Sequence, residues 1–143
     1  MNIDRVFTGP RVTLEEVLEN RNARAERQRG MLASGCVSLV SISMNIPGDI
    51  KQFPLAHDAF CEVLAVLRSA FAGHILREET VSLSTGDEAL LALDLAGDQI
   101  KRQTVSLEET HPLGRLFDLD VLDGNGTALS RSRFSLPPRR CLL

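Results

Sequence analysis

The sequence predicts an α+β fold, a two-layer sandwich in which helices pack on one face of a mainly antiparallel sheet. Three observations lead to this prediction. A chain of 143 residues has room for a single domain with one core. Its apolar residues change repeatedly between helical and strand spacing. Clusters of turn residues separate these segments, which gives a βαββαβ-like order preceded by an N-terminal helix and followed by a hairpin-like tail.

The first helix is predicted over residues 14–33. Thr13 and Glu16 have the spacing of a capping box, in which each side chain binds the backbone of the other residue. We expect a loose apolar stripe of this helix to face the core, and it consists of Leu14, Val17, Leu18, Ala25 and Leu32. The arginines on its other faces are interpreted as a solvated surface, with a docking surface as the alternative: Arg21, Arg24, Arg27 and Arg29.

The middle of the chain alternates between strands and helices. VSLVSISMNI (37–46) has a period of two, so its apolar and polar side chains occupy opposite faces of a half-buried strand. The segments that follow are a helix from Pro54 to a stop at Gly73, strands over 74–84 and 89–95 joined by a turn at 85–88, a helix over 97–110, and a strand within RLFDLDVL (115–122).

The composition excludes several classes of function. The net charge of −3 and the lack of Trp and Tyr argue against a nucleic-acid binder. No segment approaches the ~18 apolar residues of a membrane span, and the N-terminus does not resemble a signal peptide, so we expect a cytoplasmic protein that binds no membrane. The three cysteines are an odd number without a C-x-x-C pair, which indicates neither a disulfide framework nor a four-ligand zinc site.

Positive charge gathers at the C-terminal end. Residues 114–143 hold 5 basic and 3 acidic side chains, whereas residues 1–113 hold 11 basic and 16 acidic ones. The 14 arginines outnumber the 2 lysines, and the guanidinium group binds phosphate or carboxylate through two parallel hydrogen bonds. We therefore expect an anionic ligand near the C-terminal third.

Two aspartates stand out in the strand RLFDLDVL. With a period of two, Asp118 and Asp120 share one face and lie about 6.5–7 Å apart along the strand. Neighbouring carboxylates repel each other, and a Mg²⁺ ion relieves the repulsion while leaving positions for phosphate oxygens. Taken alone, such a pair more often consists of solvent-facing acids. An EF-hand loop starting at Asp118 is excluded, because Leu122 and Asp123 would occupy its fifth and sixth positions.

Basic residues follow the aspartates after DGNG (123–126), which has the composition of a hairpin turn. Cationic side chains beside a carboxylate-bound metal are what phosphoryl or nucleotidyl transfer requires, because negative charge develops on the phosphate oxygens. Surface charge is the alternative interpretation for each arginine alone. A strand returning from the turn would bring four candidates beside the aspartates: Ser130, Arg131, Arg139 and Arg140.

Four segments together resemble one family. NIPGDIK (45–51), EETHPLGRLFDLDVLD (108–123), LSR (129–131) and LPPRRCLL (136–143) are similar in order and spacing to the apo-citrate lyase phosphoribosyl-dephospho-CoA transferase family. The resemblance covers nearly the whole chain. It implies an enzyme that transfers phosphoribosyl-dephospho-CoA from 2'-(5''-triphosphoribosyl)-3'-dephospho-CoA to a serine of the acyl-carrier subunit of citrate lyase, with release of pyrophosphate.

The resemblance also implies roles for individual residues. The G-x-x-x-D-x-D element of the family, which is similar to the metal-binding element of nucleotidyltransferases, falls on Gly114, Asp118 and Asp120. We expect the aspartates to hold Mg²⁺ and the glycine to let the backbone approach the triphosphate. Four arginines complete the site: Arg115 and Arg131 would bind phosphate oxygens, and Arg139 and Arg140 would steer the anionic substrate or an acidic carrier subunit.

Four further residues are weaker candidates. Gly48 and Lys51 form a second possible phosphate site at the end of the first strand. His111 is a possible general base for the acceptor serine, although a histidine at a helix end more often stabilises the terminal carbonyl groups. Ser130 is a candidate substrate contact, with a turn or capping residue as the simpler interpretation.

Two alternatives stay open. One is the equivalent step for malonate decarboxylase, and the other is a non-catalytic domain that docks an acyl-carrier protein. Other members of the family continue into a cysteine-containing tail, so we expect a single transferase domain over residues 1–143 without that tail. Asp87 also departs from the family pattern, which has a proline after Thr85 and Gly86.

Overall fold

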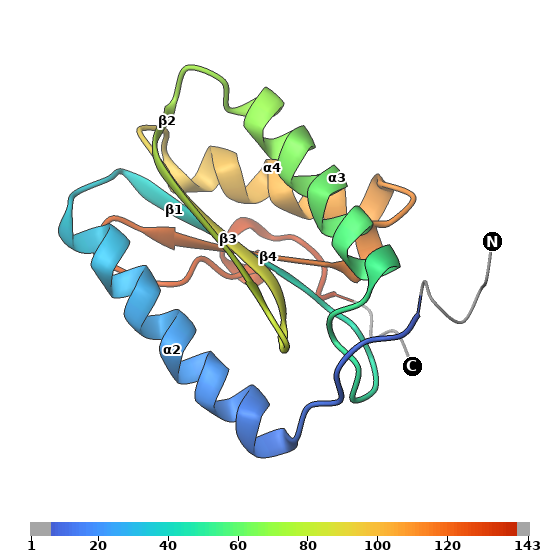
Figure 1. Cartoon of the computed structure of the whole chain (residues 1–143). Helices are drawn as coiled ribbons and strands as arrows, with labels where there is room; N and C mark the ends of the chain where they lie inside the picture. The colour runs from blue at the N-terminus through green and yellow to red at the C-terminus, as the bar shows by residue number, and fades with distance from the viewer. Residues whose placement is uncertain (1–6, 140–143) are drawn as a thin grey trace.

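One four-stranded antiparallel sheet organises the chain (Figure 1). The computed structural model describes residues 7–139. The strands lie in the order β2-β3-β1-β4, and their bounds are Ile75–Leu83 for β2, Gly86–Leu93 for β3, Ser38–Met44 for β1 and Phe117–Asp123 for β4. The predicted α+β class, the antiparallel sheet and the order of elements are confirmed.

Two helices, α3 (Pro54–Ala70) and α4 (Gly97–Thr110), cover one face of the sheet (Figure 1). Their apolar sides meet alternate residues of the strands in the main core, where burial of apolar surface supplies the dominant favourable term of folding. The bounds of α4 coincide with the prediction. Within the described residues, no helix combines the length and the apolarity that a membrane span needs.

The third long helix, α2 (Leu14–Ala33), lies against the opposite face of the sheet (Figure 1). It therefore adds a layer that the two-layer description did not include. The helix begins with the predicted capping box between Thr13 and Glu16. The predicted apolar stripe is wrong at its start, where Leu14 and Leu18 are exposed, whereas its last member, Leu32, packs against buried residues of the sheet.

Polar side chains hold α2 to the sheet together with a small apolar cluster, in which Met31 and Leu32 pack against Leu39, Leu90, Ala92 and Leu122. Asn20, Arg24 and Arg27 follow the i, i+4, i+7 spacing of one helix face, and all three bind Glu88 of β3. The interpretation of these two arginines as a solvated surface is therefore wrong. Because α2 covers this face, the polar side of β1 is buried and not half-buried as predicted.

Two predicted connections differ in the structure. The hairpin turn between β2 and β3 is shorter than 85–88, since Gly86 already begins β3 with a φ of 121°, a conformation that glycine adopts without strain. The strand predicted to return after DGNG is reduced to one bridge between Ala128 and Leu122, and a short helix, η2 (Arg131–Phe134), follows. Further pairing is blocked because Glu108 already accepts the backbone N–H of Leu119 on that edge of β4.

Candidate active site

The two predicted aspartates lie on β4, on the face that α2 covers. β4 alternates as predicted, so its apolar residues enter the core on the α3 side while Asp118 and Asp120 point the other way. Backbone pairing places Asp118 beside Ser43 of β1 and Asp120 beside Ser41. The shared direction of the two carboxyl groups is therefore fixed by the sheet.

The carboxyl group of Asp120 carries an unusual pKa. Although its side chain is exposed, surrounding protein atoms remove part of its hydration, and this desolvation raises the pKa from 3.8 to about 6. The negative charge of Asp118 adds to the rise, whereas the positive charges of Lys101 and Arg24 oppose it. The two aspartates thus repel each other in the way that a bound cation would relieve.

This raised pKa predicts a pH effect on stability. The folded protein binds a proton at Asp120 more tightly than the unfolded chain between about pH 4 and pH 6, so Asp120 makes the protein less stable as the pH rises through this window. We expect Asp120→Asn to raise the thermal midpoint at pH 7 more than at pH 4.5. Thermal unfolding without divalent cations measures this difference. An equal change of the thermal midpoint at pH 7 and at pH 4.5 would contradict this prediction.

A polar recess of about 160 Å³ lies between α2 and the sheet, and Asp118 lines it. Its walls come from α2, the end of β1 and the segment that follows it, the β2–β3 turn and β4. The recess brings the predicted Lys51 together with Asp118, two candidates that are far apart in the sequence. Its polar lining residues are Asn20, Arg21, Arg24, Ser43, Asn45, Lys51, Thr85 and Asp118.

Glu88 anchors the cationic wall of this recess. Its side chain is 6% exposed, and it accepts hydrogen bonds from Arg24 Nε at 2.9 Å and Arg27 Nη2 at 2.8 Å. Burial opposes ionisation of Glu88, but the hydrogen bonds from Arg24, Asn20 and Arg27 outweigh it and lower the pKa. Arg24 is therefore held in place beside the aspartates and is not a freely moving surface side chain.

A second buried carboxylate, Glu108 of α4, organises the C-terminal arginines. Its Oε1 accepts a hydrogen bond from Arg131 Nη2 at 2.7 Å, and its Oε2 accepts one from Arg139 Nη1 at 3.0 Å. Arg131 also binds Glu109. Burial works against the charge of Arg131, but these two carboxylates overcome it and raise the pKa. The guanidinium of Arg131 is thus bound to two carboxylates of α4. A phosphate group that contacts Arg131 would have to replace one of them.

Arg139 connects this cluster to the aspartates. Its Nη1 lies 4.0 Å from Asp118 Oδ1, and its Nη2 donates to the backbone carbonyl groups of Gly114 and Arg115. A recess of about 370 Å³ opens beside it. The predicted Arg115 lines this recess together with Glu108, Glu109, Pro137, Pro138 and Arg139. Asp118 therefore stands between two groups of cationic side chains.

Gly114 has a structural reason to be glycine. A Cβ atom at this position would lie 2.3 Å from the backbone oxygen of Glu108 and 2.6 Å from that of Leu107. The end of α4 therefore approaches this residue too closely for any side chain. The predicted approach of a triphosphate to Gly114 stays a prediction.

His111 lies on the other face of the sheet from the aspartates. Its ring centroid is 5.0 Å from that of Phe117, a core residue, and its Nε2 is 3.5 Å from Glu62 of α3. His111 Nδ1 accepts the backbone N–H of Leu113. These contacts are those of a residue that ends α4, and we leave His111 out of the proposed reaction.

The remaining predicted residues either lie apart from the aspartates or fall outside residues 7–139, which the structure describes. The Ser130 hydroxyl shares a hydrogen bond with Ser132 at the start of η2. Gly48 belongs to the same loop as Lys51 but lines a different cavity. Arg140 and Cys141 fall outside the described residues.

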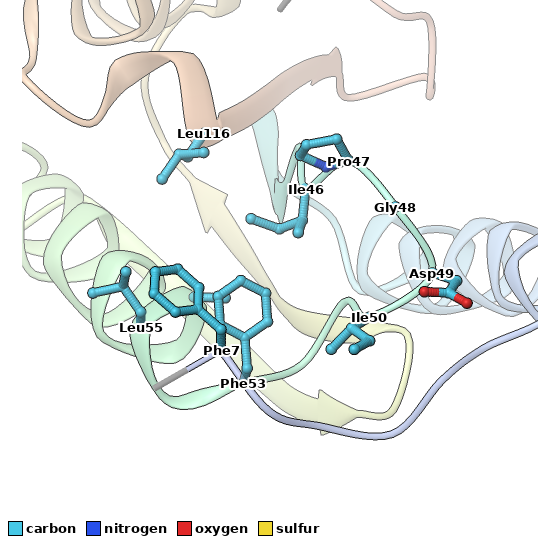
Figure 2. A pocket seen from close by; sticks show the side chains of 10 residues that line it. Phe7, Ile46, Pro47, Gly48, Asp49, Ile50, Phe53, Leu55 and Leu116 are labelled. Carbon is cyan, nitrogen blue, oxygen red and sulfur yellow. The ribbon is translucent and has the colours of Figure 1, made fainter. Parts of the chain in front are cut away.

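An apolar pocket of about 440 Å³ adjoins the polar recess across the 46–51 loop. Ile46 lines both cavities, and the rings of Phe7 and Phe53 pack with a tilt of 38° at a centroid distance of 5.9 Å on one wall (Figure 2). The lining is mainly apolar, and the wall opposite these rings carries Leu116 (Figure 2). A pocket of this size and lining suits the organic part of a ligand whose charged part lies nearby.

Sequence reasoning missed Arg24, Glu88 and Glu108. The first could have been found from the shared helix face of Asn20, Arg24 and Arg27, which carries polar atoms at a spacing usually used for core contacts. The two glutamates gave no such signal, because an acid in a strand or a helix looks the same whether it faces solvent or a buried arginine.

The donor atoms of the aspartates fit a magnesium ion. Within residues 7–139, no three His, Cys, Asp or Glu side chains gather closely enough to form a metal centre from protein groups alone. Mg²⁺ usually needs no such centre, since it binds through one or two carboxylates and completes its shell with water and phosphate oxygens. Asp118 and Asp120 offer that donor set.

Paired carboxylates beside recesses lined with arginine and lysine are an arrangement typical of transferases that act on phosphate compounds. The model of the apo-citrate lyase phosphoribosyl-dephospho-CoA transferase family matches residues 12–143. The enzymes of that name from Citrobacter koseri and Escherichia coli O6:K15:H31 are 41% and 39% identical to this chain over 137 and 135 residues. Each alignment covers 92% of this chain and 74% of the relative. The chain belongs to this family.

Proposed function

We propose that this protein transfers phosphoribosyl-dephospho-CoA from its triphosphoribosyl precursor to a serine of the acyl-carrier subunit of citrate lyase. In this reaction the serine oxygen bonds to the innermost phosphorus of the triphosphate, and the bond from that phosphorus to pyrophosphate breaks. The observation that carries the proposal is the position of Asp118, which lines the recess of Arg24 and Lys51 and lies 4.0 Å from Arg139. A triphosphate needs such a set of fixed cations.

The residues of the polar recess would have two roles, binding of the pyrophosphate group and binding of a metal ion. Arg24, Arg21 and Lys51 would bind oxygens of the leaving pyrophosphate and offset the charge that develops there. Because Glu88 orients Arg24 before substrate binds, little reorganisation is needed during the reaction. Asp118 and Asp120 would hold a Mg²⁺ ion, which when bound supplies charge neutralisation at the phosphate oxygens.

We further propose that the apolar pocket holds the adenine or pantetheine part of the substrate. The pocket lies across one loop from the polar recess, so a single ligand can place its phosphates in one cavity and its organic part in the other. Apolar walls with an aromatic pair suit a ring or an alkyl amide chain. The C-terminal arginines then face the carrier subunit, which we expect to be acidic.

Replacing Phe53 should weaken substrate binding. Phe53→Ala removes a ring that packs against Phe7 on the wall of the pocket, so we expect the KM for the triphosphoribosyl substrate to rise by about tenfold. The kcat should change much less, because the ring is remote from the phosphates. Initial rates over a range of substrate concentrations separate the two constants. Phe134→Ala, on η2 beside Arg102, is the control for a generic loss of one ring.

One assay tests the proposed function. The protein is incubated with Mg²⁺, the triphosphoribosyl substrate and the apo form of the carrier subunit, and the carrier is then weighed by mass spectrometry. A mass gain equal to phosphoribosyl-dephospho-CoA on the acceptor serine is the expected result. Binding of the carrier without a mass gain would instead support a non-catalytic docking domain. Parallel reactions with the carrier subunit of malonate decarboxylase test the related branch.

A further inference from the structure

Three side chains outside the proposed site form a chain of contacts between α3 and β3. His57 Nδ1 lies 2.8 Å from Asp87 Oδ2, and His57 Nε2 lies 3.5 Å from the sulfur of Cys61. Asp87 is buried, with 1% of its side chain exposed, whereas His57 is 50% exposed and Cys61 is exposed. The order of thiol, imidazole and carboxylate is that of an activated nucleophile.

Local structure explains why these residues meet. His57 and Cys61 are four residues apart on α3, so their side chains lie one above the other on the same helix face. β3 begins at Gly86, which places Asp87 within the strand and on the same side as Ala89, beneath α3. The contact therefore depends on two rigid elements and not on a loose loop.

Hydrogen bonds fix the positions of the Asp87 carboxylate and of the His57 ring. Asp87 Oδ1 accepts hydrogen bonds from Gln52 Nε2 and from the Ser82 hydroxyl, which leaves Oδ2 to accept from His57. A carboxylate can only accept, so the imidazole donates from Nδ1, and the neutral ring presents the lone pair of Nε2 to the thiol of Cys61. His57 is thus positioned to take the proton of Cys61.

A cation also lies near the Cys61 thiol on the same helix. Arg68 follows Cys61 by seven residues on α3 and interacts electrostatically with it, while its guanidinium is held by Glu78 of β2. Cys36 also has a nearby cation, Arg77, but burial outweighs it and raises the pKa of the thiol. Of the two cysteines within residues 7–139, Cys61 is the exposed one and the one that contacts a histidine ring.

We propose that Cys61 is a site of reversible S-thiolation by small-molecule disulfides. His57 takes the proton from the thiol, and the sulfur of Cys61 attacks one sulfur of the disulfide. The new bond joins Cys61 to that sulfur, the original S–S bond breaks, and the departing thiolate takes the proton back from His57. The disulfide supplies the oxidising equivalent, so thiols and disulfides balance on both sides. The site lies on the α3 face of the sheet, opposite the aspartates, and does not depend on the transfer reaction.

The experiment measures how fast the folded protein forms a mixed disulfide with bis(2-hydroxyethyl) disulfide, a neutral probe. Cys36→Ser and Cys141→Ser are combined so that Cys61 is the remaining thiol of the chain. We expect His57→Gln to slow modification by about tenfold or more, and Asp87→Asn to slow it as well. His74→Gln is the matched control, because His74 makes the same 2.8 Å contact with Asp94 beyond the end of α3.

The measured rates distinguish results that support the proposal from results that overturn it. Slower modification in His57→Gln with an unchanged rate in His74→Gln supports the proposal, provided that circular dichroism shows a native fold. Equal rates in His57→Gln and in the parent would overturn it, as would a rate no faster than that of the same protein unfolded in urea. If Asp87→Asn fails to fold, the His57 comparison still decides. Cys61→Ser should retain transfer to the carrier, which distinguishes failure here from failure of the proposed function.

Discussion

Asp118→Asn is expected to lower the rate of transfer to the carrier subunit by at least about a hundredfold. Asp118 is the residue that both groups of cationic side chains approach, since it lines the recess of Arg24 and Lys51 and lies 4.0 Å from Arg139. The amide keeps the shape of the side chain but loses the charge that binds a cation. Single-turnover rates, followed by the mass of the carrier, measure the loss.

The same strand supplies the control for this prediction. Asp123→Asn makes the same chemical change at the end of β4, where the side-chain oxygen accepts the N–H groups of Asn125 and Thr127. An amide oxygen can still accept both bonds, so transfer should stay close to that of the parent. Asp118→Asn should fold at least as stably as the parent, because it removes one of two repelling charges. Global unfolding of Asp118→Asn would show that the aspartate is structural.

Glu108→Ala is expected to destabilise the protein by about 3–5 kcal/mol. Only 4% of the Glu108 side chain is exposed, and it binds Arg131, Arg139 and the backbone N–H of Leu119. Its removal leaves two guanidinium groups and one edge N–H without their buried acceptor. Urea unfolding, with the free energy extrapolated to water, measures the change.

The neighbouring glutamate separates this effect from a general loss of charge. Glu109 is 47% exposed and also binds Arg131, so Glu109→Ala should cost less than about 1 kcal/mol. Glu108→Gln should fall between the two, because it keeps an acceptor for Leu119 but loses the charge that Arg131 and Arg139 bind. Equal stabilities of Glu108→Ala and Glu109→Ala would contradict the role assigned to Glu108 as the organiser of the C-terminal arginines.

Some features of the structure could be predicted from the sequence, because they depend only on residues that are close together in the chain. The alternation of β4 needs only the period of two, and it placed Asp118 and Asp120 on one face. The capping box of α2 likewise needs only Thr13 and Glu16. These features hold wherever the element lies in the fold.

Other features could not be predicted, because they depend on which residue of another helix or strand packs against the side chain. In the sequence, Arg24 looks like a solvated arginine. In the structure, α2 packs on the sheet and Arg24 binds Glu88 of β3. The phosphate contact of Arg131 stays a prediction, but its pairing with Glu108 of α4 could not be seen in the sequence. A charged side chain has the same local pattern in both settings, and only its partner decides whether it is buried or available.

The sequence by itself determined the class of fold, the order of elements, the shared face of the two aspartates and, through its four motifs, the family. The tertiary structure decided which cations surround those aspartates, which face α2 covers and where His111 lies. The physical reason is the separation along the chain of the residues that interact. Helix and strand periodicity is set by residues a few positions apart, whereas the pairing of Glu88 and Glu108 with arginines joins segments that meet only after the sheet has formed.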